Sequence, residues 1–323
     1  MDESIGLIQS YLLDGRGGAA KLARRGVEDW KPGDPPVWVH MDLTAPAAAG
    51  WLEEAAELDE WVIEALTYPG SRPRTVVHEE GVLVVLRGPN LNPGADASSM
   101  IPLAIWADRH RLITLRSEAL KSITDLRLSL EEGRGPGNVA DAVIFLVEAL
   151  EGRLAGLVAR HEEELDRLGE LDRFADARSR RALSELRHDV ARLRRFLIPQ
   201  REAVGALAAA KPAGFDADDF VQLREQANLY TRLVEELETV REEAGIVQEE
   251  WASRADETMN RRLYVLSIIA AVFLPLTLVS GMLGMNVGGV PASDEPLGFW
   301  VVSVVLVLMA LLVLLGLRAK RWL

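Results

Sequence analysis

The chain has no cysteine, and two long segments near its C-terminal end have no charged residue and no histidine. Without cysteine, disulfide bonds and thiolate metal sites are excluded. Residues 263–285 and 298–317 also contain no Asp, Glu, Lys or Arg, so neither segment offers a carboxylate or imidazole that could strip water from a metal ion. The five histidines all lie elsewhere in the chain, at His40, His78, His110, His161 and His188.

Two further features are missing from the sequence. Residues 1–20 mix Asp2, Glu3 and Asp14 with apolar residues, which predicts that no secretory signal peptide is present. Residues 90–94, Asn-Leu-Asn-Pro-Gly, lack the glycine spacing and the lysine of a phosphate-binding loop and indicate an ordinary turn. No nucleophile–base set stands out, so we expect no enzyme activity and no resident cofactor.

The two uncharged segments are long enough to cross a membrane. They contain 23 and 20 residues, and a hydrocarbon core of about 30 Å needs about 20 residues of helix. Arg261 and Arg262 precede the first segment, basic residues follow the second, and residues 286–297 between them contain no Lys or Arg. The positive-inside rule then places both ends of the chain in the cytoplasm and the short connecting loop outside. We expect the spans to lie in the inner membrane. Topology alone leaves open a simple two-span anchor for a cytoplasmic domain.

The charge of the chain is unevenly distributed. Of the 36 Lys and Arg and the 49 Asp and Glu, residues 261–323 hold five and two, so residues 1–260 carry 31 against 47, a net charge of −16. Residues 216–260 alone hold 13 acidic residues against four arginines. This excess argues against nucleic acid or anionic lipid as partners of the soluble part and favours cations. A merely solvated helix face is the alternative.

The soluble part is predicted to be an α/β domain, residues 1–137, followed by a helical arm, residues 138–262. In the first part we expect strands over residues 4–13, 37–41, 82–86, 101–106 and 111–115, and helices over 47–66 and 118–131. The glycine- and proline-rich residues 133–137 mark the boundary between the two. The third part is the two-span domain with its basic tail, residues 263–323.

The helical arm begins at Asn138, a good capping residue. Residues 138–210 contain two apolar stripes at heptad spacing, which predict an antiparallel pair of helices. His161 lies on the first stripe. Its side chain could be packed between helices or bind a metal ion, and the sequence favours packing. A third helix starts after Asp216 and meets no proline before Pro275, so it runs unbroken into the first span, over about 100 Å at 1.5 Å per residue.

Residues 273–286 end in Gly284-Met285-Asn286, and this segment resembles the CorA superfamily of divalent-cation transporters. Residues 287–291, Arg72-Pro-Arg74 and residues 86–96 resemble the ZntB-like, zinc-transporting branch of that superfamily. The resemblance implies a funnel-shaped homopentamer with a central pore, zinc as cargo, and Gly284, Met285 and Asn286 as the selectivity filter. Transport of magnesium, cobalt or nickel is an alternative, and a membrane-tethered metal sensor or scaffold without flux is another.

One face of the first span is a candidate pore lining. Helical steps of three and four residues from Gly284 reach Gly281, Thr277, Leu274, Ala270, Leu266 and Leu263. This face is small at its outer half, whereas the opposite face is uniformly bulky. A packing seam between helices explains the same pattern. Asn260, before the span, is added to the pore by the family resemblance alone. Asn286 has a neutral amide, which suits a divalent ion that keeps its water shell.

Overall fold

The computed structural model describes residues 6–68, 70–171, 176–285 and 297–319. The chain divides into two compact units, Met1–Gln248 and Glu249–Leu323. The three-part division of the sequence at residues 137 and 262 remains a prediction.

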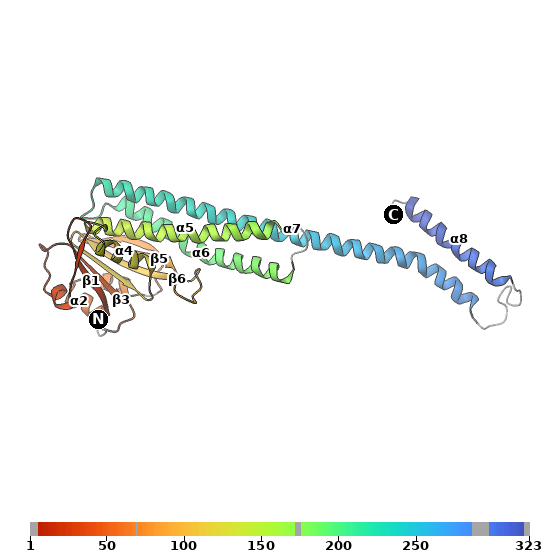
Figure 1. Ribbon diagram of the computed structural model, residues 1–323, viewed down its shortest axis with the longest axis horizontal. Helices are drawn as coiled ribbons and strands as arrows, with labels where there is room; N and C mark the ends of the chain where they lie inside the picture. Colours follow the sequence, from red (N-terminus) through yellow and green to blue (C-terminus); the bar gives the residue numbers. More distant parts are fainter. Residues whose placement is uncertain (1–5, 69, 172–175, 286–296, 320–323) are drawn as a thin grey trace. The chain divides into compact units, whose positions relative to one another are not determined.

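The first unit is built on a mixed, seven-stranded sheet with the strand order β2-β1-β3-β7-β6-β5-β4 (Figure 1). The central pair, β3 and β7, is parallel with Val39 opposite Ile113, and every other pair is antiparallel. The strands are β1 (Leu7–Leu13), β2 (Ala19–Lys21), β3 (Val37–Asp42), β4 (Arg74–Val77), β5 (Gly81–Pro89), β6 (Met100–Asp108) and β7 (Arg111–Arg116). All five predicted strands are present, and the short strands β2 and β4 were not predicted.

Helices α1 (Arg24–Glu28), α2 (Ala48–Glu54) and α3 (Glu60–Thr67) belong to the main apolar core of this unit. The prediction of one helix over residues 47–66 is wrong. The chain leaves the helix at Ala55 and passes through Glu57, whose φ of 51° is left-handed, before α3 starts. This break lets both short helices bury an apolar face, including Leu52 and Leu66, in the core.

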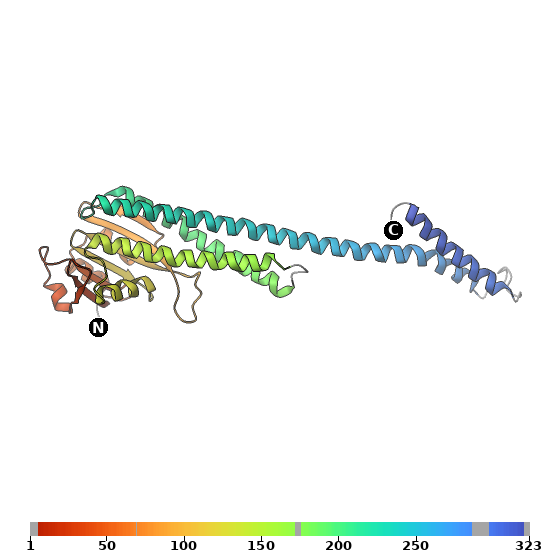
Figure 2. The same cartoon turned by 45° about the horizontal axis from the view of Figure 1, so that its top comes forward.

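Helices α4 (Lys121–Glu131), α5 (Val139–Gly169) and α6 (Ala177–Ala210) pack on the sheet through contacts with β2, β4, β5, β6 and β7. Figure 2 shows α5, α6 and the first part of α7 running side by side. The predicted cap of the first arm helix is confirmed, because the Asn138 side chain accepts a hydrogen bond from the backbone N–H of Asp141. Gly214, in the α6–α7 turn, has a φ of 91° and would place a Cβ 2.8 Å from the Cα of Arg109, so a side chain there would be strained and would clash.

A buried amide joins the helical arm to the sheet. Gln200 Oε1 accepts a hydrogen bond from Arg87 N at 2.7 Å, and Gln200 Nε2 donates to Arg87 O at 3.1 Å and to the Tyr230 hydroxyl at 3.2 Å. That hydroxyl donates to Val147 O at 3.3 Å. Strand β4 ends its pairing with β5 at Val85, so the Gln200 amide satisfies β5 backbone groups that β4 does not reach.

The long helix predicted after Asp216 is confirmed as α7 (Ala217–Leu283), a single element of 67 residues. Asp216 Oδ1 accepts hydrogen bonds from the N–H groups of Asp218 and Asp219, as expected of a cap. The second unit contains the end of α7 and α8 (Gly298–Ala319).

Candidate functional site

The candidate site lies on the apolar part of α7. Both α7 and α8 contain a window that is long and apolar enough to cross a bilayer, and none of either window is buried within the chain. Large side chains such as Leu266, Phe273 and Leu274 are 62–69% exposed. A core helix of a soluble protein would bury such residues, so these surfaces require lipid or further protein around them.

The two faces of the first span differ in their exposure. On the face predicted to line a pore, Leu263, Leu266, Leu274, Thr277 and Gly281 are exposed, and only Ala270 is half-buried. On the opposite face, Val265 is exposed and the other members are half-buried, namely Ile268, Val272, Leu276, Val279 and Leu283. The structure therefore leaves the predicted pore face open to an axis, a neighbouring copy or lipid.

Thr277 differs from the serines of the described spans. Ser267 and Ser303 donate to the carbonyls four residues earlier, at 2.8 and 2.9 Å, and Ser280 donates to Thr277 O at 3.2 Å. Within the described part of the chain, the Thr277 hydroxyl has no such partner. It is free to bind water or a group from another copy, a property that sequence alone does not reveal.

Two features of α7 mark the C-terminal half of the first span, a proline within the helix and the helix end itself. Pro275 lies inside α7 and has no N–H, so the carbonyl of Ala271 lacks its usual donor. Gly284 N donates to Ser280 O at 2.9 Å, and Gly284 and Met285 are both exposed. Asn286, the third residue of the predicted filter and the predicted ion-binding group, lies outside the described residues.

On the N-terminal side of the span, α7 carries exposed acidic residues with few partners. Glu238 pairs with Arg194, and Glu250 with Arg254. Among the residues that the structure describes, several acidic side chains have no ion pair, namely Glu242, Glu243, Glu249, Asp256 and Glu257. Asn260, at the end of this segment, is also exposed. These groups give the segment before Arg261 and Arg262 an excess of negative charge, which attracts cations.

The described residues contain no group of three or more His, Cys, Asp or Glu side chains placed to hold a metal ion. His161 in particular is half-buried on α5, and its Nε2 atom is buried without a hydrogen-bond partner in the described structure. Burial lowers the pKa of His161, which keeps the ring neutral. The structure thus agrees with a packed His161.

Residues 34–320 match the protein family described as CorA-like Mg2+ transporter protein. The chain belongs to this CorA family. It is 40% identical to "Divalent cation transporter CmaX" of Pseudomonas aeruginosa, covering 98% of this chain and 97% of that protein. It is 30% identical to "Zinc transport protein ZntB" of Pectobacterium atrosepticum, covering 98% and 96%.

Solved structures agree with this assignment. The full-length CmaX protein superposes with a TM-score of 0.86 at 37% identity, covering 99% of both chains. The CorA magnesium transporter of Methanocaldococcus jannaschii has the same fold, with a TM-score of 0.82 at 18% identity over 98% of this chain and 99% of that one. The predicted CorA-like fold is therefore confirmed, and the chain is a divalent-cation transporter of the membrane. This family assignment also agrees with the expectation that it is not an enzyme.

Proposed function

We propose that this chain assembles as a homo-oligomer, with five copies as the family resemblance implies, and conducts zinc through a central pore lined by α7. Among its described residues a single copy has two candidate spans, and two helices cannot enclose a path for an ion. A closed ring of copies can do so, with one α7 from each copy around the axis. The observation that carries the proposal is the exposed, uncharged face from Leu263 to Gly281.

The ion passes the spans with its water shell. No carboxylate, imidazole or thiolate lies within residues 263–285 or 298–317 to replace that water. Gly284, Met285 and Asn286 form the filter, and the Asn286 amides of the ring bind the ion through its first water shell. The acidic part of α7 raises the local cation concentration below the pore. Asn260 marks the inner end of the path.

Leucine rings provide the gate. Leu263, Leu266 and Leu274 lie on the pore face at the inner half of the span, and a narrow apolar ring closes a pore by excluding water. Thr277 adds one hydroxyl from each copy on the filter side of Leu274. There the hydroxyl helps to hold the water molecules that solvate the ion. Pro275 removes one backbone hydrogen bond next to this position and allows the helix to bend as the rings widen.

Zinc is the proposed cargo because residues 72–74, 86–96 and 287–291 resemble the ZntB-like branch, and because a relative with 30% identity is named a zinc transport protein. Magnesium is the second candidate, favoured by the name of the matched family. Orientation follows the positive-inside rule, with both termini in the cytoplasm and the spans in the inner membrane. A non-conducting metal sensor is a third candidate.

The test is metal uptake into liposomes that contain the purified full-length protein, with zinc and magnesium compared at equal concentration, with and without a pH gradient. Zinc uptake that exceeds both magnesium uptake and the protein-free control supports the proposal. Magnesium uptake that equals or exceeds zinc uptake would overturn the assignment of zinc as the cargo but would still support a pore. No uptake of either ion would favour the sensor.

A further inference from the structure

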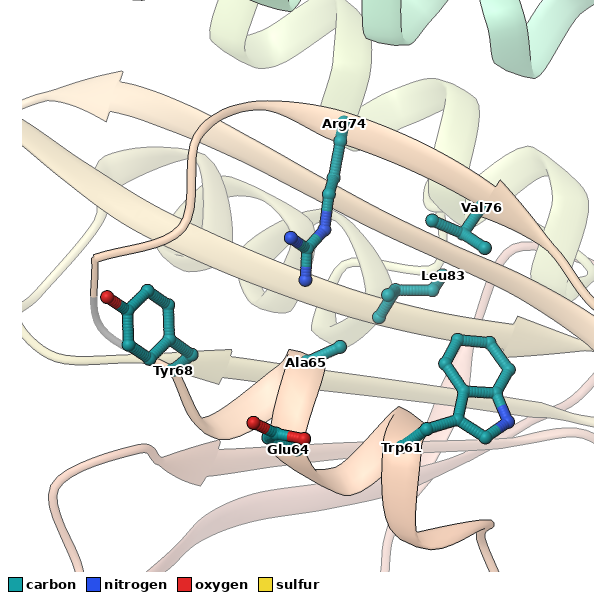
Figure 3. Close-up of a pocket in the computed structure, with 7 residues that line it drawn as sticks. All are labelled: Trp61, Glu64, Ala65, Tyr68, Arg74, Val76 and Leu83. Carbon is teal, nitrogen blue, oxygen red and sulfur yellow. The ribbon is translucent and has the colours of Figure 1, made fainter.

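A pocket of about 460 Å³ opens in the first unit beside the sheet edge formed by β4. Figure 3 shows it between α3, which carries Trp61 and Glu64, and β4, which carries Arg74. The pocket is lined by Trp61, Glu64, Ala65, Tyr68, Arg74, Val76 and Leu83. It lies in the soluble part of the chain and plays no part in the proposed ion path.

The Trp61 wall of this pocket is held in place by its neighbours. The Trp61 ring packs against the His78 ring with centroids 5.5 Å apart, and His78 Nε2 lies 3.2 Å from Asp59 Oδ2. The Tyr68 ring, by contrast, is 61% exposed. The Trp61 wall of the pocket is therefore preformed, which lowers the entropic cost of binding against it.

The segment that leads into β4 is also anchored. Arg87 donates through Nε and Nη2 to the Ser71 carbonyl at 3.2 and 3.0 Å, and Thr75 Oγ1 donates to Ala203 O at 2.7 Å. Leu83 and Ala65 are buried and give the pocket an apolar surface. An apolar cavity with a few converging polar groups is the usual form of a small-molecule site.

Two opposite charges face this cavity without pairing. Figure 3 shows the Arg74 guanidinium reaching toward α3 between Tyr68 and Trp61, with the Glu64 carboxylate on the α3 side. In the described structure neither side chain forms an ion pair or a side-chain hydrogen bond, although both line the same pocket. A simple anion bound to Arg74 would be repelled by Glu64, and a simple cation bound to Glu64 would be repelled by Arg74. A ligand that carries both charges satisfies both groups.

We propose that this pocket binds a small zwitterion with an apolar body, of the class of apolar or aromatic α-amino acids. Arg74 binds the carboxylate, for which its planar fork of N–H donors is suited, and Glu64 accepts from the ammonium group. The apolar body lies against Leu83, Val76 and the Trp61 ring. A ligand of this class is smaller than the volume of the pocket. An aromatic side chain on the ligand would also stack on Trp61 or Tyr68.

The test is isothermal titration calorimetry on the full-length protein in detergent, with L-phenylalanine as the probe. EDTA is present so that no metal ion can link the amino acid to the protein. We expect saturable binding at one site per chain with a Kd below about 1 mM. Phenethylamine, which lacks the carboxylate, and 3-phenylpropionate, which lacks the ammonium group, should each bind about tenfold more weakly because each leaves one charge unpaired. Absence of saturable binding of L-phenylalanine up to about 10 mM would overturn the proposal.

Substitutions separate the two charges. Arg74→Gln should weaken L-phenylalanine binding about tenfold without weakening phenethylamine binding, because it also removes a charge that repels the amine. Glu64→Gln should weaken L-phenylalanine binding without weakening 3-phenylpropionate binding. Arg72→Gln is the matched control, because Arg72 is exposed nearby and does not line the pocket. All three side chains are exposed, so the variants should keep the melting temperature of the unaltered protein. Equal losses in Arg74→Gln and Arg72→Gln would contradict the assigned contact.

Discussion

The Nε–H of Arg116 donates a hydrogen bond to Nε2 of His40 across 2.8 Å within the first unit. Because Nε2 accepts, we assign the ring proton to Nδ1, which donates to Oγ1 of Thr114 at 2.8 Å. Trp38 Nε1 donates to the same hydroxyl at 2.9 Å. Burial, followed by the positive charge of Arg116, lowers the pKa of His40 to about 3, so the ring is neutral in the folded chain.

Acid should destabilise the first unit through His40. The folded pKa lies below the ordinary value of 6.5, so between these values the unfolded chain binds a proton that the folded chain excludes. The free energy of unfolding should therefore fall as the pH drops below about 6.5, by up to about 1.4 kcal/mol per pH unit, with no contribution above 6.5. Urea unfolding followed by circular dichroism at several pH values measures this slope.

The control for this prediction is His40→Gln, which keeps a polar side chain and removes the titration. It should be less stable at neutral pH, because Arg116 and Thr114 lose a shaped partner, and it should lose the part of the acid slope due to His40. Identical slopes in the two proteins would show that His40 is not the group responsible.

The Gln200 amide should contribute more to stability than the Tyr230 hydroxyl. Gln200→Leu removes the two hydrogen bonds that the Gln200 amide makes with the Arg87 N–H and carbonyl, at a cost of about 2–4 kcal/mol, whereas Tyr230→Phe removes one weak donor and should cost about 1 kcal/mol. Chemical unfolding at neutral pH measures both. Tyr68→Phe, at a residue that is 61% exposed, is the neutral control. A Gln200→Leu variant as stable as the control would contradict the bridging role.

Thr277 should support flux through its free hydroxyl. Thr277→Val keeps the shape and removes the hydroxyl, so metal uptake should fall about threefold, the effect of one lost hydrogen bond, while Thr277→Ser should retain uptake. Ser267→Ala is the matched control, since the Ser267 hydroxyl is already bonded to Leu263 O. Equal losses in Thr277→Val and Ser267→Ala would indicate a general packing effect.

The leucine rings should hold the pore closed. Leu274→Ser makes the ring wettable, so uptake should rise and discrimination between zinc and magnesium should weaken. Val272→Ser is the control on the opposite, half-buried face and should not raise uptake. A greater increase in Val272→Ser than in Leu274→Ser would place the path on the other face of the helix.

Much of the fold follows from local signals in the sequence. The caps at Asn138 and Asp216, the apolar strands and the uncharged spans each depend on residues close in sequence, and the structure confirms them. The break between α2 and α3 does not follow from a local signal, because residues 55–59 contain no glycine or proline. There the burial of two short helices in the core overrides helix propensity and places Glu57 in a left-handed conformation.

The candidate site likewise has some features that the sequence predicts and others that only the structure reveals. Helical steps from Gly284 define the face from Leu263 to Gly281, the family resemblance favours this face as a pore lining over a packing seam, and the structure adds that it is the more exposed one. The free hydroxyl of Thr277 depends on side-chain rotamers, and the charges facing the pocket depend on α3 and β4 coming together in space. Neither of these two features produces a periodic pattern that could be recognised in the sequence. The role of Asn286 remains a prediction.

The absence of cysteine from the chain makes it suited to the deciding measurement, which is metal uptake by single-cysteine variants treated with a water-soluble, positively charged thiol reagent. The account predicts that the reagent blocks uptake by Thr277→Cys, on the face proposed to line the pore, and spares Val279→Cys, on the opposite face. Equal block of both variants, or continued uptake by fully labelled Thr277→Cys, would contradict a pore along this face of α7.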